Sequence, residues 1–200
     1  MDERFKEFLD ELYESGQQND LQATAKRDKL LNITPDTGTF LSLLVKATEA
    51  RAILEIGTSN GYSTLWLAEA VQRTGGRVTT VELNPAKAEL ARANFEKIGL
   101  SLFIDLVVSD AETFLQTTQP HSFDFIFWDA DRTQYVSHWR SVNASLKPGG
   151  LVVVDNAVSH RQELAPFQKL LEETPGFSTA LVPVGKGELL IWKEKLPIDG

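Results

Sequence analysis

ILEIGTSNGYSTLWLA, residues 53–68, is the most informative segment of this chain for predicting its fold. Its first four residues form a short, mostly apolar run that predicts a buried strand. Gly57 and Gly61 bound the loop that follows, and glycine allows positive φ angles and the close approach of a ligand to the main chain. Ser63 or Thr64 is then expected to cap a helix with apolar residues suited to packing on a sheet. A strand, a glycine loop and a helix in this order predict a site for a small polar ligand at the helix N-terminus.

The composition limits the classes of protein that need to be considered. Two hundred residues with 42% apolar content suffice for one domain with a sizeable core. The formal net charge is −8 and there is no basic run, which argues against a nucleic-acid partner. Cysteine is absent, which excludes disulfides, zinc–thiolate sites and cysteine nucleophiles. Because neither a signal peptide nor a membrane-spanning run is visible, we expect a cytoplasmic protein with no membrane partner.

The first quarter of the chain is predicted to be helical. Residues 2–15 carry apolar side chains at helical spacing, and Gly16 is expected to end that helix. Residues 21–31 form a second amphipathic piece, and a third helix is expected from Asp36 or Thr37 to Ala47. We therefore interpret residues 1–50 as a helical cap in front of an α/β core, both within a single domain of residues 1–200.

From residue 51 onward the pattern alternates between strand and helix. Strands are predicted over 53–56, 77–83, 102–108, 123–128 and 151–154, and the helix before the fifth is expected to stop at Pro148-Gly149-Gly150. Two further strands, 177–184 and 188–193, flank Gly185-Lys186-Gly187, which is typical of a hairpin turn. The sequence thus predicts an α/β, Rossmann-like sheet of seven strands, mostly parallel, with an antiparallel C-terminal hairpin.

Two acids help to distinguish the possible ligands. The spacing Gly57-x-x-x-Gly61 departs from the G-x-G-x-x-G pattern of dinucleotide sites and suits S-adenosylmethionine, which has no pyrophosphate. Glu82 ends the second strand, where an acid can accept both ribose hydroxyls, and Asp110 follows the third, within reach of an adenine ring. Alternatively, Glu82 is only a surface charge before a turn and Asp110 only caps the next helix. Their common position beyond parallel strand ends favours ligand binding.

At this point the chain resembles the cation-dependent O-methyltransferases of the catechol and caffeoyl-CoA type, a class of S-adenosylmethionine-dependent methyltransferases. The motif Leu54–Ser63 is similar to the first motif of that family. The other matching stretches, in order, are Pro35–Leu41, Val81-Glu82, Ser109–Ala111, Phe127–Asp131, Gly149-Gly150 through Asp155-Asn156, and Pro183–Gly187. Together they cover nearly the whole chain.

The resemblance implies a seven-stranded sheet with an antiparallel final strand, S-adenosylmethionine as methyl donor, and a homodimer that uses the N-terminal segment. With the glycine loop, it predicts a set of donor-binding residues around the strand ends. These are Glu55, Gly57, Thr58, Ser59, Gly61, Tyr62, Ser63, Glu82, Asp110, Ala111 and Asp129.

A cation site is predicted after the fourth and fifth strands. Asp129, Asp155 and Asn156 supply two carboxylates and an amide carbonyl, a set of oxygens suited to Mg²⁺, Ca²⁺ or Mn²⁺. Alternatively, Asp129 starts the next helix and Asp155-Asn156 is a turn. In the resembled family the matching positions hold the metal. A cation bound by two vicinal hydroxyls lowers the pKa of one of them, and the resulting oxyanion can attack the donor methyl.

The chain departs from the family at Arg132, which replaces the usual lysine base three residues after the first metal aspartate. Arginine stays protonated in proteins and cannot act as a general base. Our hypothesis is that Arg132 stabilises a phenolate or a substrate carboxylate, so Arg132 and Asp129 are the predicted catalytic residues. His160 is the best spare base. Because residues 157–162 form a shorter segment than in larger relatives, an acyl-CoA acceptor is not carried over.

The sequence as a whole predicts an S-adenosylmethionine-dependent O-methyltransferase acting on a small, catechol-like hydroxylated aromatic with a divalent cation. One alternative is a metal-independent small-molecule methyltransferase, which the replacement at Arg132 keeps open. Another is a non-catalytic S-adenosylmethionine-binding protein whose partners use the helical N-terminus. A nicotinamide oxidoreductase lacks support from the glycine pattern, and selective NADH binding would revive it.

Overall fold

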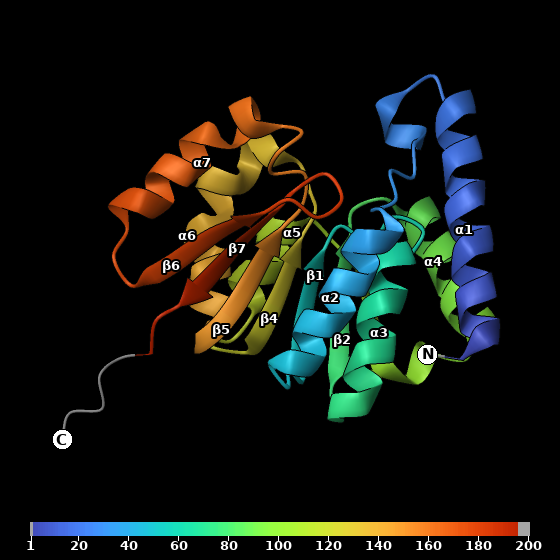
Figure 1. Cartoon of the computed structure of the whole chain (residues 1–200), viewed down its shortest axis with the longest axis horizontal. Coiled ribbons are helices and arrows are strands. Elements are labelled where there is room, and N and C mark those ends of the chain that lie inside the picture. Colours follow the sequence, from blue (N-terminus) through green and yellow to red (C-terminus); the bar gives the residue numbers. More distant parts are fainter. Residues whose placement is uncertain (1, 196–200) are drawn as a thin grey trace.

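A seven-stranded sheet forms the centre of the computed structural model, which describes residues 2–195 (Figure 1). The strand order is β3-β2-β1-β4-β5-β7-β6, and only β7 pairs antiparallel to its two neighbours. The strands are β1 (Ala52–Ile56), β2 (Arg77–Glu82), β3 (Ile104–Val108), β4 (Phe123–Trp128), β5 (Leu146–Val154), β6 (Phe177–Val182) and β7 (Glu188–Lys193). The predicted α/β class, strand count and C-terminal hairpin are confirmed.

Helices cover both faces of this sheet and bury two apolar cores. The helices are α1 (Glu3–Gln22), α2 (Pro35–Ala47), α3 (Tyr62–Thr74), α4 (Pro85–Ile98), α5 (Ala111–Thr117), α6 (Tyr135–Ser145) and α7 (Arg161–Glu173), with short 3₁₀ turns at Lys26–Asp28, Ser101–Phe103 and Arg132–Gln134. One core joins α1 to α4 with the sheet, and aromatic side chains of β4, α6 and α7 dominate the other. Figure 1 shows the two helical layers on either side of the strands.

Local capping signals explain several helix ends. Thr34 caps α2 by accepting from the Thr37 amide, and Pro35 takes the first helical position. Asn84 and Pro85 start α4 in the same way, and Gly99 ends it with a φ of 77°. These ends follow from short sequence signals, so α2 and α4 lie close to their predicted positions.

The N-terminal segment differs from its prediction at two places. The helix α1 does not end at Gly16, because this glycine lies inside it against the side chain of Asn32. A Cβ at Gly16 would lie 2.3 Å from Asn32 Nδ2, so the glycine serves close packing. The second amphipathic piece, residues 21–31, is not a separate helix: its first two residues end α1 and the rest contains only the short 3₁₀ turn, and Leu21 is 87% exposed. The carboxylate of Asp20 holds the chain there by accepting from the amides of residues 30 and 31.

Two other expectations about element ends were wrong. The helix α3 starts at Tyr62 with Gly61 as its N-cap, rather than being capped by Ser63 or Thr64, because Gly61 takes a left-handed φ of 85°. The strand β5 starts at Leu146 and runs through the Pro-Gly-Gly sequence, rather than starting at residue 151. A register shift between Phe123 and Phe125 of β4 accommodates the extra residues.

Within residues 2–195, no helix is long and apolar enough to cross a bilayer.

Candidate active site

The glycine loop between β1 and α3 lies directly against the end of β4. Gly57 has a φ of 104°, and a Cβ on it would lie 2.1 Å from the carbonyl oxygen of Asp129. Both the backbone angle and the close contact therefore require glycine at this position. Asp129 in turn donates its amide to Ile56 O, so the two strand ends are fixed side by side. This contact brings the predicted donor loop next to the first predicted metal ligand.

The carboxylate of Glu82 braces the same loop. Its Oε2 accepts from the Ser59 amide at 2.7 Å and its Oε1 accepts from the Asn84 amide at 2.8 Å. These contacts fix the carboxylate at the edge where parallel strands end. A carboxylate oxygen can accept more than one hydrogen bond, so these contacts leave Glu82 able to accept hydrogen bonds from ribose hydroxyls as well, and that role stays a prediction.

Glu55 lies beneath the loop and is fully buried. Its Oε2 accepts from the hydroxyls of Thr64 and Thr80, and Thr80 in turn contacts the Thr58 hydroxyl at 2.5 Å. Burial raises the pKa of Glu55 to about 7, against the opposing effect of hydroxyl groups at Ser63, Thr64 and Thr80. Within residues 2–195, its Oε1 has no hydrogen-bond partner. Glu55 therefore supports the loop, and its Oε1 still has the capacity to accept a hydrogen bond.

Asp110, one of the predicted donor contacts, also has a clear structural role of its own. Asp110 caps α5, since its Oδ1 accepts from the amide and the hydroxyl of Thr113 at 2.9 and 3.1 Å. The backbone hydrogen bond from Thr113 is the main cause that lowers the pKa of Asp110. Asp110 thus caps the next helix, as the alternative interpretation of the sequence stated. Asp110 and Ala111 follow the end of β3, and ligand binding by these two residues stays a prediction.

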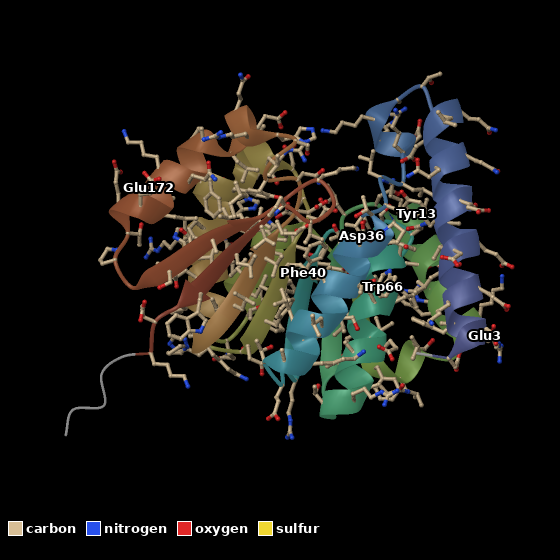
Figure 2. All side chains as sticks on the ribbon, in the orientation of Figure 1. Glu3, Tyr13, Asp36, Phe40, Trp66 and Glu172 are labelled. Carbon is tan, nitrogen blue, oxygen red and sulfur yellow. The ribbon has the colours of Figure 1, made fainter. Side chains whose placement is uncertain are left out.

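Two aromatic side chains next to the predicted site, Tyr62 and Trp128, are buried in the core. Tyr62 is 1% exposed and packs on Tyr13 of α1 and on Trp66, with ring centroids 5.6 and 6.5 Å away (Figure 2 labels Tyr13 and Trp66). Trp128 is fully buried against Tyr135 and a phenylalanine of α7. The Tyr62 ring is therefore part of the core at the start of α3, and the predicted role of Tyr62 in donor binding stays a prediction.

The predicted cation ligands converge at the ends of β4 and β5. Asn156 Nδ2 lies 3.5 Å from Asp129 Oδ1 and 2.5 Å from Asp155 Oδ2. Asn156 has a φ of 65°, a left-handed conformation that asparagine tolerates better than most residues. Asp155 is 3% exposed and Asn156 8%, so both are almost completely buried. The structure thus brings together all three residues that the sequence analysis selected.

The carboxyl groups at this site repel one another electrostatically. Burial and the neighbouring charges of Asp155 and Glu55 raise the pKa of Asp129 well above its usual value, while Lys186 and Arg132 act in the opposite direction. Two adjacent buried carboxylates are unfavourable unless a positive charge lies between them. The donor set of two carboxylates and one amide therefore fits a hard divalent cation. Within the described residues, no group of three or more His, Cys, Asp and Glu side chains has the arrangement of a metal site.

Glu188 is a residue of this region that the sequence analysis missed. It starts β7, is fully buried, and accepts from the Thr37 hydroxyl at 3.0 Å. Burial, followed by the charge and contact of Asp155, raises the pKa of Glu188 to about 10. The available signal was an acid at the first position of an otherwise apolar strand.

Arg132 occupies the rim of the same site but is already paired. Its Nε donates to Glu163 Oε2 of α7 at 2.9 Å, and its side chain is 13% exposed. The Ser159 hydroxyl lies 2.9 Å from His160 Nδ1, and the partly exposed His160 starts α7 as its N-cap. Arg132 thus lies close enough to Asp129 to lower the pKa of its carboxyl. The ion pair with Glu163 of α7 orients the guanidinium.

Comparison with protein families and curated proteins identifies relatives along most of the chain. The model of a family described as O-methyltransferase matches residues 5–193. The catechol O-methyltransferase of Mycobacterium tuberculosis is 34% identical over 166 residues, covering 77% of this chain and 75% of that protein. A caffeoyl-CoA O-methyltransferase of Eucalyptus gunnii is 28% identical over 200 residues, covering 88% of this chain and 80% of its own length.

A solved structure agrees with these sequence matches. The O-methyltransferase from Bacillus cereus, in complex with SAH, superposes with a TM-score of 0.78 at 28% identity. The match covers 94% of this chain and 91% of that one.

Proposed function

This chain belongs to the O-methyltransferase family, and on that premise we propose that it methylates one hydroxyl of a small, catechol-like aromatic with the help of a divalent cation. It is an S-adenosylmethionine-dependent enzyme that acts on small molecules. The observation that carries the finer proposal is the convergence of Asp129, Asp155 and Asn156 beside Gly57 of the donor loop. Mg²⁺ is the cation we propose first, with Ca²⁺ or Mn²⁺ as alternatives.

The donor is proposed to lie across the strand ends from β1 to β3. The loop around Gly57 to Gly61 would meet its aminoacyl end through backbone amides at the start of α3. Glu82, fixed by two amides, would accept from the ribose hydroxyls, and Asp110 with Ala111 would lie near the adenine. The open Oε1 of Glu55 lies beneath the loop, where a carboxylate favours the positive charge of the donor.

The acceptor is proposed to lie over the carboxylates of β4 and β5. Asp129, Asp155 and the amide oxygen of Asn156 would hold the cation, with a half-turn of the amide exchanging Nδ2 for Oδ1. When bound, the cation acts as a Lewis acid that lowers the pKa of an acceptor hydroxyl. Because Asp129 contacts the Gly57 loop, an acceptor oxygen held through Asp129 would lie at a fixed position relative to the donor methyl.

The transfer itself is a single displacement. The acceptor hydroxyl releases its proton to water, its oxygen forms a bond to the methyl carbon, and the bond from that carbon to sulfur breaks. S-adenosylhomocysteine leaves as the neutral thioether. The buried position of Asp155 and Asn156 keeps the base of the site away from water, which strengthens the electrostatic interactions there.

Arg132 is proposed to stabilise negative charge on the acceptor, and its removal tests that role. We expect Arg132→Ala to lower the single-turnover rate constant for methyl transfer about tenfold, because one charged group near the developing reaction loses its effect. Glu163→Gln is the matched control, since it removes only the partner of the guanidinium. An unchanged rate constant in Arg132→Ala would exclude the proposed role.

Chelation tests the proposed function with the unmodified protein. We expect turnover of catechol to fall by about a hundredfold in EDTA and to return with added Mg²⁺, and phenol to be a poor acceptor throughout. Equal turnover with and without the chelator would favour a metal-independent methyltransferase. Tight donor binding with no turnover across a panel of hydroxylated aromatics would favour a non-catalytic binding protein.

The predicted homodimer stays a prediction. The outer surface of α1 and α2 offers an apolar groove that includes Leu9, Leu43 and Trp66, and Leu43 is 62% exposed. A second copy of the chain is the occupant implied by the family.

A further inference from the structure

The connection between α1 and α2, drawn in blue in Figure 1, is bonded to the proposed donor site. We call its residues 29–31 the crossing segment. The Ser59 hydroxyl of the glycine loop donates to the Leu30 carbonyl at 2.7 Å. Lys87 Nζ, in the first turn of α4, donates to the Lys29 carbonyl at 2.6 Å. The N-terminal part of the chain is thus joined directly to the loop that is proposed to hold the donor.

Ser59 links the crossing segment to the carboxylate of Glu82. Its amide donates to Glu82 Oε2 at 2.7 Å, while its hydroxyl donates to the Leu30 carbonyl. Ser59 has a φ of 51°, a left-handed conformation that is uncommon for residues other than glycine. The crossing segment is therefore only one residue away from the carboxylate that is proposed to accept from the ribose hydroxyls.

The crossing segment has an unfavourable backbone conformation of its own. Leu31 has a φ of 53°, which brings the Cβ of a leucine too close to the following carbonyl oxygen. Backbone strain of this kind persists only where neighbouring contacts hold it, and it is concentrated at ligand sites and switches. Because Ser59 shares the left-handed conformation, two strained residues flank the bond between Ser59 and Leu30.

Asp20, near the end of α1, holds the crossing segment in this conformation. Its Oδ1 accepts from the Leu30 amide at 2.6 Å and its Oδ2 accepts from the Leu31 amide at 2.8 Å. Burial acts to raise the pKa of Asp20, but hydrogen bonds from Asn19, Leu30 and Leu31 outweigh it and lower the pKa below its ordinary value. Hydrogen bonds to an ionised carboxylate are stronger than those between neutral groups.

We propose that the crossing segment forms a wall of the donor site at its ribose edge, and that Asp20 is the positioning residue that holds this wall closed. The inference rests on the proposed donor site around Gly57 and Glu82. Asp20 acts through Leu30 and Ser59 and does not contact the donor itself. The bond between Ser59 and Leu30 opens before S-adenosylhomocysteine leaves, so the hold of Asp20 lengthens the lifetime of the bound complex.

Amide hydrogen exchange in the unmodified protein, followed by NMR with and without S-adenosylhomocysteine, tests the wall. The Leu30 and Leu31 amides are bonded to Asp20, so their exchange reports each opening of that contact. We expect saturating S-adenosylhomocysteine to slow their exchange at least about tenfold. Protection of residues 57–61 with no change at residues 29–31 would overturn this inference alone. Absence of S-adenosylhomocysteine binding would overturn the proposed donor site as well.

Asp20→Ala tests the positioning role. We expect it to weaken S-adenosylhomocysteine binding at least about tenfold, through faster dissociation, because Leu31 is no longer held at a positive φ. Asp20→Asn should give an intermediate affinity, since its amide keeps one acceptor oxygen. Asp28→Ala is the matched control, because it removes the same charge next to the crossing segment from a side chain that is 60% exposed. Calorimetric titration gives the affinity, and a chase of radiolabelled S-adenosylhomocysteine gives the dissociation rate.

A second substitution separates positioning from structural damage. Leu31→Gly, added to Asp20→Ala, should restore most of the lost affinity, because glycine adopts a positive φ without the steric conflict of leucine. Failure to restore any affinity would overturn the positioning role. A lower thermal midpoint in Asp20→Ala, with unchanged affinity and dissociation rate for S-adenosylhomocysteine, would make Asp20 a purely structural residue and would also overturn it.

Discussion

Asp155→Ala is expected to lower cation-dependent methyl transfer to catechol by about a thousandfold, equivalent to roughly 4 kcal/mol of activation free energy. The variant removes one of the two carboxylates that would hold the cation. The Asp155 side chain that is lost is almost completely buried, with 3% of its surface exposed. The remaining Asp129 and Asn156 cannot hold a divalent cation well, because affinity depends strongly on the number of charged ligands.

Donor binding should survive this change. The loop around Gly57 and the carboxylate of Glu82 are held by their own backbone contacts, none of which involves Asp155. Single-turnover rates and S-adenosylhomocysteine affinity measured together would show the separation. Asp105→Ala, which changes an exposed aspartate on β3, provides the control. A rate within about threefold of the unmodified enzyme, against the thousandfold loss expected, would contradict the assignment of Asp155 to the cation.

Gly57→Ala is expected to destabilise the fold by about 3 kcal/mol or more and to abolish donor binding. The backbone has a φ of 104°, and the added Cβ would lie 2.1 Å from the carbonyl oxygen of Asp129. Either the loop or the end of β4 must move, and each carries predicted ligand contacts. Chemical denaturation and calorimetric titration with S-adenosylhomocysteine measure the two effects.

Gly75→Ala provides the matched control for that variant. Gly75 also has a positive φ, of 75°, but no atom within 4 Å of a built Cβ. Its cost should be limited to the backbone strain of alanine in a left-handed conformation, about 1 kcal/mol. If the two variants lost equal stability and both bound S-adenosylhomocysteine normally, the close contact between the loop and β4 would not be needed for stability or for donor binding.

Local patterns were sufficient to predict the scaffold. The apolar run before Gly57 and the glycine loop after it fix a strand and a turn without help from distant residues. Asp129 and Asp155 follow neighbouring parallel strands, and such ends meet at one edge of the sheet, so their convergence was predictable.

Distant contacts explain what could not be predicted. Gly16 continues α1 because Asn32, far along the chain, packs against it, and the Tyr62 ring is buried against Tyr13 of α1. The contact of Glu188 with Asp155 depends on the antiparallel register of β5 and β7, which the sequence pattern alone does not specify. Whether Arg132 is free or paired depends likewise on where α7 packs.

Calorimetric titration of Mg²⁺ into the protein loaded with S-adenosylhomocysteine is the best test of the proposed cation site, because it requires no knowledge of the acceptor. We predict one saturable site that is lost in Asp155→Ala, which would place Asp129, Asp155 and Asn156 at a functional cation. No saturable binding while S-adenosylhomocysteine remains bound would contradict the claim, and the search for the activating group would then turn to a protein base such as His160.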